Sequence, residues 1–348
     1  MGIKSLHIDN FKSLVDFHLE LPGNFVAFVG PNAAGKSNIF EALEFLTHVF
    51  LFGLDTASNN FGTAKRYLNF NLQDKLQRGL SGDCEATLKI ESHLGELGGV
   101  IRFLPTEDNF QPSTYGRNFF WSLPEEDTRD RIEEIRAAET RFAKSFTRLF
   151  IGREDLVKFK ADGSERLRID GANLEAVLWR LLQREVVREE LIDWLQTLVP
   201  GLEKVEVRQS ELSGQYYLQL YEHGLARPLD KHLISDGTYN LLCLLAAVYQ
   251  SDEPQFLCIE EPENGLNPYV IKTLTEFFRS VCEEKGHVIW LNTHSATLVK
   301  ALQPREIVLV DKVEGITRAQ TLPSDIDLHG LDLDEAWLSN ALGGGLPW

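Results

Sequence analysis

The spacing of apolar residues divides the chain into segments of different predicted structure. The first thirty residues favour three strands, and the last of these, 25–29, is continuously apolar, as expected for a buried strand. The apolar positions of the first two strands are Ile3, Leu6, Ile8 and the run 14–21. A glycine-rich turn ends the third strand. From about Lys36, apolar residues recur at helical spacing, at Ile39, Leu43 and Leu46, and predict a helix.

The middle of the chain changes from a strand pattern to a helical one. Alternating apolar residues on either side of a glycine-rich turn at 95–99 predict an antiparallel β layer over 84–123. Residues 124–200 are predicted to be mostly helical, and no heptad pattern is long enough for a coiled coil. The three helix faces consist of Ile132, Ile135, Phe142, Phe146 and Leu149; of Leu174, Val177, Leu178 and Leu181; and of Leu191, Trp194, Leu195 and Leu198.

Strands return after Pro200 and then alternate with helices. Two strands are predicted between 205 and 220. The elements that follow are a helix at 237–249, a buried strand at 256–259, a helix near 268–284, and strands at 287–291 and 307–310. This alternation predicts an α/β fold with a mostly parallel sheet and helices on its faces.

Composition narrows the class of protein. The 348 residues can bury a full core, and the hydrophobic (43%) and charged (25%) contents are ordinary for a globular protein. The formal net charge of −17 means that nucleic-acid binding would need a local basic face. The N-terminus does not resemble a signal peptide, no segment is apolar enough to cross a bilayer, and the four cysteines have no metal-binding spacing. We therefore expect a cytoplasmic protein without membrane contact.

The strongest chemical signal is a phosphate-binding loop. The run Gly30-Pro31-Asn32-Ala33-Ala34-Gly35-Lys36-Ser37 matches G-x-x-x-x-G-K-[ST] and stands between a buried strand and a predicted helix, which is the context this motif needs. Small residues let backbone N–H groups surround a phosphate, and the helix N-terminus adds a favourable dipole. Lys36 offers a charge to the β- and γ-phosphates of ATP, and Ser37 offers a hydroxyl to Mg²⁺.

A second signal is the pair of carboxylates that ends the buried strand 256–259. Neighbouring residues on a strand point in opposite directions, so Glu260 and Glu261 can have separate tasks. We assign Glu260 to the metal. We assign Glu261 to orienting and deprotonating the attacking water, because ATP hydrolysis depends mainly on positioning and charge neutralisation.

Further motifs carry a resemblance to a known family. They are Ile234-Ser235-Asp236-Gly237-Thr238, the run 260–268, Asn292-Thr293-His294-Ser295, Asn10-Phe11-Lys12-Ser13, the extension of the phosphate loop into Asn38, and the tail at 335–344. Together they resemble the signature, Walker B with D-loop, switch-histidine and N-terminal motifs of ABC-type ATPases of the RecF, SMC and OLD-like group. The resemblance includes the small bacterial ATPases related to that group, and it covers roughly 1–50 and 230–345.

The resemblance implies a single P-loop ATPase head of ABC type over 1–348. Its parts would be a Walker A lobe (1–83), the antiparallel β layer (84–123), an inserted helical subdomain (124–200), and a signature and Walker B lobe (201–348). It also implies an ATP-dependent, head-to-tail homodimer that encloses two ATP molecules. The phosphate loop of one copy would face Ser235 and Gly237 of the other, where a hydroxyl and a helix N-terminus form a second anion site. His294 would contact the γ-phosphate or the attacking water.

Some positions depart from the family pattern. Glu260 stands where an aspartate is usual, and Asp236 stands where glycine is common and adds negative charge near a phosphate site. The glutamine of the Q-loop could be Gln73 or Gln77, and either could be an ordinary surface residue. Lys12 could reach the nucleotide or be exposed.

Two functions remain open on the sequence alone. One is a dimerising ATPase that switches a partner or a DNA complex, in DNA repair, recombination or antiviral defence. The other is a clamp that holds ATP, hydrolyses it very slowly and regulates a separate effector protein. Glu261 favours the enzyme, and the insertion at 124–200 argues against a transporter subunit. One basic stretch could form a DNA or partner surface, or an ordinary mixed face: Arg141, Lys144, Arg148, Arg153, Lys158, Lys160, Arg166 and Arg168.

Overall fold

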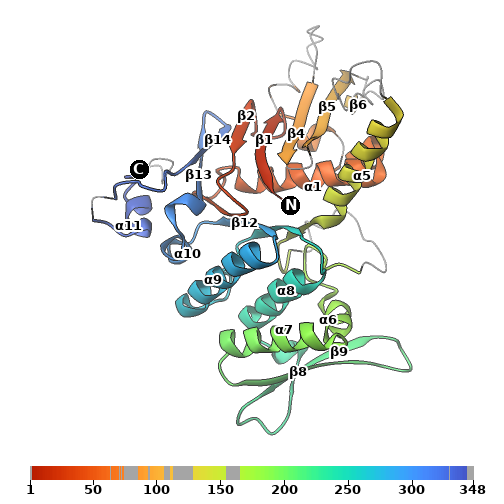
Figure 1. The fold of residues 1–348 in the computed structure, drawn as a ribbon, viewed down its shortest axis with the longest axis vertical. Coiled ribbons are helices and arrows are strands. Elements are labelled where there is room, and N and C mark those ends of the chain that lie inside the picture. The colour runs from red at the N-terminus through yellow and green to blue at the C-terminus, as the bar shows by residue number, and fades with distance from the viewer. Residues whose placement is uncertain are drawn as a thin grey trace.

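The structure is a computed structural model, which describes residues 2–62, 64–69, 71, 73, 85–92, 95–105, 110–112, 128–153, 165–328 and 330–342. Over these ranges the chain forms three β-sheets. A central sheet divides an upper layered lobe from a lower, mainly helical lobe (Figure 1).

The central sheet has the order β14-β13-β3-β12-β11-β7. All its neighbouring pairs are parallel except β13 with β14. Its strands are β3 (Phe25–Val29), β7 (Phe146–Leu149), β11 (Phe256–Glu260), β12 (Val288–Thr293), β13 (Ile307–Val313) and β14 (Ile316–Thr321). The predicted α/β fold with a mostly parallel sheet is confirmed.

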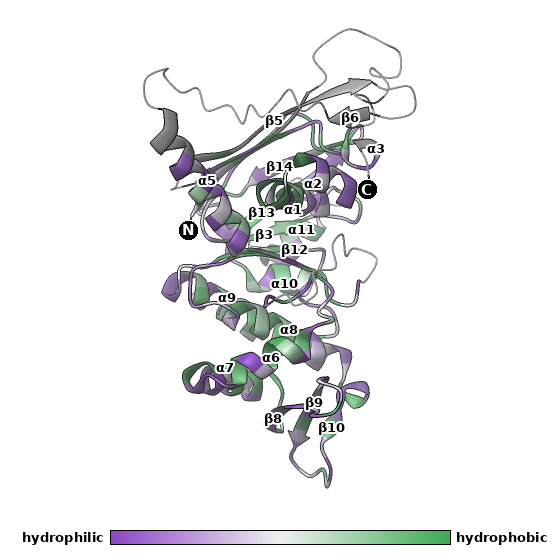
Figure 2. Cartoon of the chain, turned by 90° about the vertical axis from the view of Figure 1, so that its right-hand side faces the viewer, coloured by the Kyte–Doolittle hydropathy of each residue, from purple (hydrophilic) through white to green (hydrophobic). Residues whose placement is uncertain are grey.

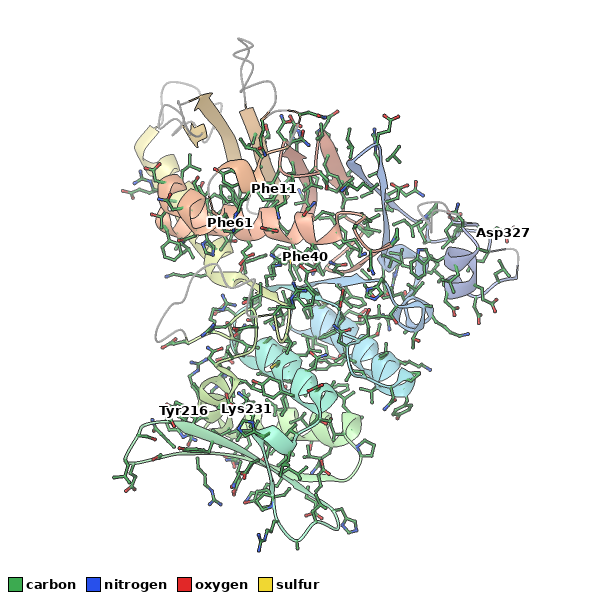
Figure 3. The ribbon with its side chains drawn as sticks, turned by 180° about the vertical axis from the view of Figure 1, so that it is seen from behind. Phe11, Phe40, Phe61, Tyr216, Lys231 and Asp327 are labelled. Carbon is green, nitrogen blue, oxygen red and sulfur yellow. The ribbon has the colours of Figure 1, made fainter. Side chains whose placement is uncertain are left out.

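The upper lobe is an antiparallel sheet, β2-β1-β4-β5-β6, packed over helix α1. Figure 2 shows α1 as an apolar helix between this sheet and the central strands. Phe11, Phe40 and Phe61 gather around it (Figure 3). The elements are β1 (Ile3–Asp9), β2 (Phe17–Glu20), α1 (Lys36–Phe52), α2 (Leu54–Asn60), α3 (Ala64–Tyr67), β4 (Glu85–Ser92), β5 (Gly95–Pro105), β6 (Phe110–Pro112) and α5 (Thr128–Ser145). The antiparallel layer therefore includes the two N-terminal strands.

The lower lobe packs helices against the opposite face of the central sheet and ends in a small antiparallel sheet, β10-β9-β8. Tyr216 and Lys231 lie at this far end (Figure 3). Its elements are α6 (Leu174–Leu182), α7 (Glu185–Leu198), β8 (Leu202–Gln209), β9 (Tyr216–Glu222), β10 (Leu229–Asp230), η3 (Lys231–Leu233), α8 (Asp236–Tyr249) and α9 (Pro268–Glu284). At the side of the central sheet lie α10 (Ala296–Ala301), η4 (Pro304–Glu306) and α11 (Leu333–Leu338).

Alternate residues of each central strand enter different hydrophobic cores. In β3, Val26 and Phe28 pack in the upper core, whereas Ala27 and Val29 pack in the lower one. The central strands are therefore covered on both faces, which explains why their sequences are continuously apolar rather than alternating. Each large side chain buried in this way contributes roughly 1.5–3 kcal/mol to stability.

The prediction of one helix through Phe142, Phe146 and Leu149 is wrong. Helix α5 ends at Ser145, and the next four residues form β7 at the edge of the central sheet, paired with β11. All four are buried. A surface helix buries one stripe of side chains, whereas a strand covered by both lobes buries both faces, and a short apolar run does not distinguish the two.

The part of the chain that the structure describes contains no helix that is both long and apolar enough to cross a membrane.

Candidate functional site

The phosphate loop joins β3 to α1 at the carboxyl end of the central sheet, and two of its glycines are required by close packing. A Cβ atom on Gly30 would stand 2.0 Å from the carbonyl oxygen of Val310. Gly35 has φ of 100°, and a Cβ there would stand 1.9 Å from Oγ1 of Thr317. Ala33 also lies in the left-handed region, at φ 65°. The loop is therefore held tightly against β13 and β14, with Asn32 and Ala33 exposed at its tip.

Lys36 is folded against its own loop. Its ammonium donates to the carbonyl oxygens of Gly30 at 2.8 Å and Pro31 at 2.9 Å. The side chain is buried, and burial lowers its pKa to about 8 despite the opposing effect of nearby carboxylates. A buried cation whose hydrogen-bond partners are neutral gains from a nearby anion, and this is the property that phosphate binding requires.

A hydroxyl network ties the loop to both ends of the chain. Ser13 Oγ lies 2.6 Å from Thr317 Oγ1, and Thr317 donates to the carbonyl oxygen of Ala34 at 2.9 Å. The side-chain amide of Asn38 donates to Ser13 Oγ at 2.7 Å. Asn38, expected among the nucleotide-binding residues, therefore supports the loop from behind. Lys12 also turns towards α1, where its ammonium pairs with the carboxylate of Glu41 at 2.5 Å.

The hydroxyl of Ser37 points at Glu260. Ser37 Oγ donates to Oε2 of Glu260 at 2.6 Å. Asn292, at the end of β12 between β3 and β11, donates from Nδ2 to the same carboxylate oxygen at 2.6 Å and to Ser37 Oγ at 3.0 Å. Asn292 belongs to a motif seen in the sequence, but the sequence pattern assigns it no role. Ser37 and Glu260 thus bring together two hard oxygen donors of the kind that Mg²⁺ prefers, and Asn292 holds both in place.

Arg148 holds the other oxygen of Glu260. From β7, its Nε and Nη2 donate to Oε1 of Glu260 at 3.0 Å and 2.5 Å, while Nη1 donates to Oε2 of Glu44 on α1 at 2.8 Å. The side chain is only 3% exposed. Burial alone would lower the pKa of Arg148, but the two carboxylates outweigh it and raise the pKa above its ordinary value. This buried Glu44–Arg148–Glu260 cluster was not predicted from the sequence.

Glu261 faces a different environment from Glu260. Its side chain is 30% exposed, against 1% for Glu260, so the two carboxylates do point to different surroundings. The backbone of Glu261 lies in the left-handed region, at φ 49°, and strain of this kind concentrates at functional sites. Its Oε1 lies 3.5 Å from Nδ1 of His294, and its Oε2 accepts from the amide of Asn264 at 3.0 Å. Glu261 and His294 therefore meet beside the end of β11.

Glu263 adds a third carboxylate to this edge. It accepts from the hydroxyl of Thr293 at 2.5 Å, and burial raises its pKa. Its other oxygen, Oε2, is buried without a partner among the described residues. The edge of the central sheet is therefore strongly acidic, apart from Lys36 and Arg148.

The signature motif forms the start of α8. Ser235 is the N-cap, and its Oγ accepts from the backbone N–H of Thr238 at 3.2 Å. Ser235 and Asp236 are exposed, whereas Gly237 is buried: a Cβ there would stand 2.2 Å from the carbonyl oxygen of Gly265. Asn240, one turn further along α8, donates from Nδ2 to the carbonyl oxygens of Pro262 and Asn264, both at 3.0 Å. The signature helix is thus attached to the turn that follows Glu261 in its own chain.

A cleft of 850 Å³ lies between the start of α8 and the end of β11. Its lining includes Asp170, Lys231, Asp236, Glu260 and Glu261. None of the phosphate-loop residues lines it, but Glu260, which accepts from Ser37 of that loop, does.

The two Q-loop candidates stand apart from these contacts. Gln73 is buried rather than on the surface, and its amide donates to the carbonyl oxygen of Leu68 at 2.8 Å. Gln77 lies outside the described residues.

The basic stretch is partly structural. Arg148 is buried in the Glu260 cluster, so its assignment to a DNA surface is wrong. Arg166 donates to the carbonyl oxygen of Ser145 at 3.1 Å and to Gln255 Oε1 at 2.9 Å, and Arg168 pairs with Asp170 at 3.0 Å. Lys158 and Lys160 lie outside the described residues.

Comparison with known proteins places this geometry in a family. Residues 25–300 match the family model described as "AAA domain, putative AbiEii toxin, Type IV TA system". The chain belongs to this AAA domain family. The match includes the phosphate loop, the signature, the acidic strand end and His294, and it supports the resemblance to RecF- and SMC-like ABC-type ATPases drawn from the motifs.

Relatives in sequence and in structure agree with this assignment. The DNA replication and repair protein RecF of Lactococcus lactis is 28% identical over 109 residues, covering 31% of this AAA domain protein and 28% of RecF. The chromosome partition protein Smc of Burkholderia pseudomallei is 38% identical over 72 residues, covering 20% of this chain and 6% of Smc. The chain thus spans less than a third of either relative. An SMC head crystallised with the C-winged helix domain of ScpA superposes with a TM-score of 0.58 at 16% identity, covering 93% of this chain and 98% of that head. The fold is that of an SMC ATPase head.

Proposed function

We propose that this protein binds and hydrolyses ATP with Mg²⁺, and that two copies pair head to tail around the nucleotide. The observation that carries the proposal is the convergence of Ser37, Glu260 and Asn292 within 3.0 Å at the end of the phosphate loop, with Glu261 and His294 beside them. This arrangement combines a phosphate cradle, oxygen donors for a divalent cation and a base for water, which are the parts that phosphoryl transfer requires.

The residues present fit ATP and Mg²⁺. Gly30 and Gly35 leave no room for a side chain, so backbone N–H groups can approach phosphates closely, and Lys36 can exchange its carbonyl partners for phosphate oxygens. Ser37 and Glu260 would hold Mg²⁺, which neutralises charge that develops on the phosphate oxygens. Arg148 fixes one oxygen of Glu260, so that its other oxygen stays directed at Ser37. This contact offsets the extra length of Glu260 relative to the usual aspartate.

Glu261 would accept a proton from the attacking water, and His294 would orient that water or contact the γ-phosphate. Several features support these roles: the partial exposure of Glu261, its left-handed backbone, and its contacts with His294 and Asn264.

Pairing of two copies is supported by the exposure of the signature. Ser235 is exposed at the N-terminus of α8, where its hydroxyl and the backbone N–H groups of the first turn can meet a phosphate brought by another molecule. Two large apolar side chains flank this region, Leu233 before the signature and Tyr269 at the start of α9, each 67% exposed. Exposed apolar residues of this size favour a protein interface.

Steady-state ATP hydrolysis measured against protein concentration, with and without duplex DNA, tests the proposal. Specific activity that rises with concentration is expected if catalysis needs two copies. Faster ATP hydrolysis in the presence of DNA would indicate that the protein acts in DNA repair or surveillance. A monomeric, inactive protein at every concentration would overturn the proposal.

The second candidate is a clamp that holds ATP, turns it over very slowly and controls a separate effector, for example in antiviral defence. Asp236 favours it, because an exposed carboxylate in the first turn of α8 repels the phosphate that the signature would bind. Under this alternative, ATP drives dimerisation in gel filtration while hydrolysis stays negligible, and Asp236→Gly accelerates turnover.

A further inference from the structure

Two histidines and an aspartate meet on the outer face of the upper sheet, away from the phosphate loop. His7 on β1 and His18 on β2 are register partners across the antiparallel pair. Their ring centroids are 3.9 Å apart, with 19° between the ring planes. Oδ1 of Asp16 lies 3.1 Å from Nε2 of His18. The nearest ligand atoms of all three residues lie within 4.8 Å of one another.

The backbone holds Asp16 in place for this contact. Asp16 has φ of 48°, a left-handed conformation that costs energy for a residue other than glycine. Its N–H donates to Oδ1 of Asp9 at 2.8 Å, and the amide of Asn10 donates to Oδ2 of Asp9 at 3.0 Å. The turn that carries Asp16 is thus fastened to the end of β1, close to His7. The backbone of Asp16 is therefore held in place, while its side chain, 84% exposed, and that of His18, 60% exposed, remain open to an ion from solvent.

The charged groups around the imidazole rings of His7 and His18 favour the binding of a cation there. Asp9 and Asp16 both face His7, and Lys89, its register partner on β4, is the opposing positive charge. Imidazole binds metal ions through a ring nitrogen, and here two such rings lie beside a carboxylate.

We propose that His7, His18 and Asp16 form a binding site for a divalent transition-metal ion of the Zn²⁺ class. Two imidazole nitrogens and one carboxylate oxygen are a donor set for Zn²⁺ and its first-row neighbours, whereas Mg²⁺ and Ca²⁺ take oxygen donors. Ligands about 2.0–2.2 Å from a tetrahedral ion lie roughly 3.3–3.5 Å from each other. The His18–Asp16 distance of 3.1 Å is already close to that separation. The His7 ring would have to turn out of its stack with His18 for a nitrogen of each ring to reach the same ion. The fourth position stays open to water or another ligand.

The site lies at the base of the loop that supports the nucleotide-binding region. Residues 8–15 join the ligands, and within them Lys12 pairs with Glu41 of α1 while Ser13 accepts from Asn38. An ion bound at the base would tether both ends of this loop. Metal occupancy would therefore stabilise the contacts that Lys12 and Ser13 of this loop make with the start of α1, independently of whether ATP is hydrolysed.

Isothermal titration of the metal-free, nucleotide-free protein with ZnCl₂ tests the proposal. A Cys84→Ser background removes a thiol that could bind Zn²⁺ in its own right. One ion per chain is expected. Loss of a residue that only supports a metal ligand weakens metal binding by roughly 10- to 100-fold. His18→Asn or His7→Asn removes a ligand itself and should weaken Zn²⁺ binding by more than that. Asp9→Asn, which changes a residue that holds Asp16 rather than a ligand, should cause a smaller loss.

The matched control is His223→Asn. His223 is exposed and lies 3.1 Å from the carboxylate of Glu203, so it reproduces the histidine–carboxylate pair, and among the described residues no third ligand completes a cluster around it. Retained Zn²⁺ affinity in His223→Asn with loss in His18→Asn supports the site. Equal affinity in wild type and both His7→Asn and His18→Asn, or the absence of saturable Zn²⁺ binding by the wild type, would overturn it. Circular dichroism of each variant keeps loss of fold separate from loss of a ligand.

Discussion

Arg148 and Glu260 form an ion pair across two adjacent parallel strands, with Nε of the arginine 3.0 Å from Oε1 of the carboxylate. The two oxygens of Glu260 have different partners: Oε1 accepts from Arg148, and Oε2 accepts from Ser37 and Asn292. Glu44 occupies the remaining side of the guanidinium. Strand β11, which carries Glu260, is thereby joined to both β7 and α1.

Arg148→Met should destabilise the fold strongly. It leaves Glu260 and Glu44 buried without their cation, and breaking a buried ion pair costs about 3–5 kcal/mol. Urea unfolding of the variant measures this cost. The control is Arg227→Met, an exposed arginine between β9 and β10, which should change stability by less than about 0.5 kcal/mol. Similar losses in both variants would show that the Glu260 cluster is not what makes Arg148 important.

Glu261→Gln should keep ATP binding but slow hydrolysis by about 10²–10⁴-fold, since the amide cannot accept the proton of water. Gel filtration with ATP should then reveal an accumulated dimer. Glu314→Gln is the matched control, because Glu314 is also a non-glycine residue in the left-handed region, at φ 50°, but lies in the β13–β14 turn. Hydrolysis at the wild-type rate in Glu261→Gln would exclude it as the base.

Lys36→Ala should abolish measurable ATP binding. Removing the partner of a buried charged contact costs about 2–5 kcal/mol, which is roughly 30-fold or more in Kd. Fluorescent-nucleotide titration measures the change. The control is Lys312→Ala, an exposed lysine of β13. Tight binding by Lys36→Ala would mean that the loop holds the phosphates by its backbone alone.

The pKa of Lys36 also predicts a pH dependence. Burial lowers it to about 8, so the ammonium is present below pH 8 and is lost as the pH rises through this value. ATP affinity of the free protein should therefore be constant towards neutral pH and fall by up to about tenfold per pH unit above 8. Titrations between about pH 7 and 9.5 measure this. A flat profile across pH 8 would contradict the low pKa, and Lys36→Arg provides the reference that does not titrate.

Gly237→Ala should disturb the turn that follows Glu261. The added Cβ would stand 2.2 Å from the carbonyl oxygen of Gly265, and this backbone contact cannot be relieved by rotating a side chain. We expect a loss of about 1–3 kcal/mol in stability, measured by urea unfolding, and slower hydrolysis. Gly23→Ala serves as control, because nothing lies within 4 Å of the point that its added Cβ would occupy. A neutral Gly237→Ala would mean that α8 can move away from the turn at little cost.

The sequence was sufficient for the elements whose pattern is set by local rules. The buried strand 25–29, the phosphate loop and α9 were each specified by continuous apolar runs, glycines or helical spacing. Glu260 and Glu261 were recognised as having different surroundings because strand geometry alternates them. Failures occurred where residues distant in sequence decide the outcome. The sequence of β7 reads as the last turn of a helix, because the strand that pairs with it, β11, lies far along the chain. Arg148 reads as a surface cation, because Glu44 and Glu260, which enclose it, are each more than a hundred residues away in sequence.

The contact between Ser13 and Thr317 has a consequence for synthesis of the protein. These residues are 304 positions apart, yet together they brace the phosphate loop through Ala34 and Asn38. A chain emerging from the ribosome presents Lys36 early, but the strand that carries Thr317 arrives only when most of the polypeptide has been made. Because domains fold as units during synthesis, the phosphate loop lacks this support until that strand docks. Under the proposed function, the loop therefore reaches its final form only after the signature and His294 have been made.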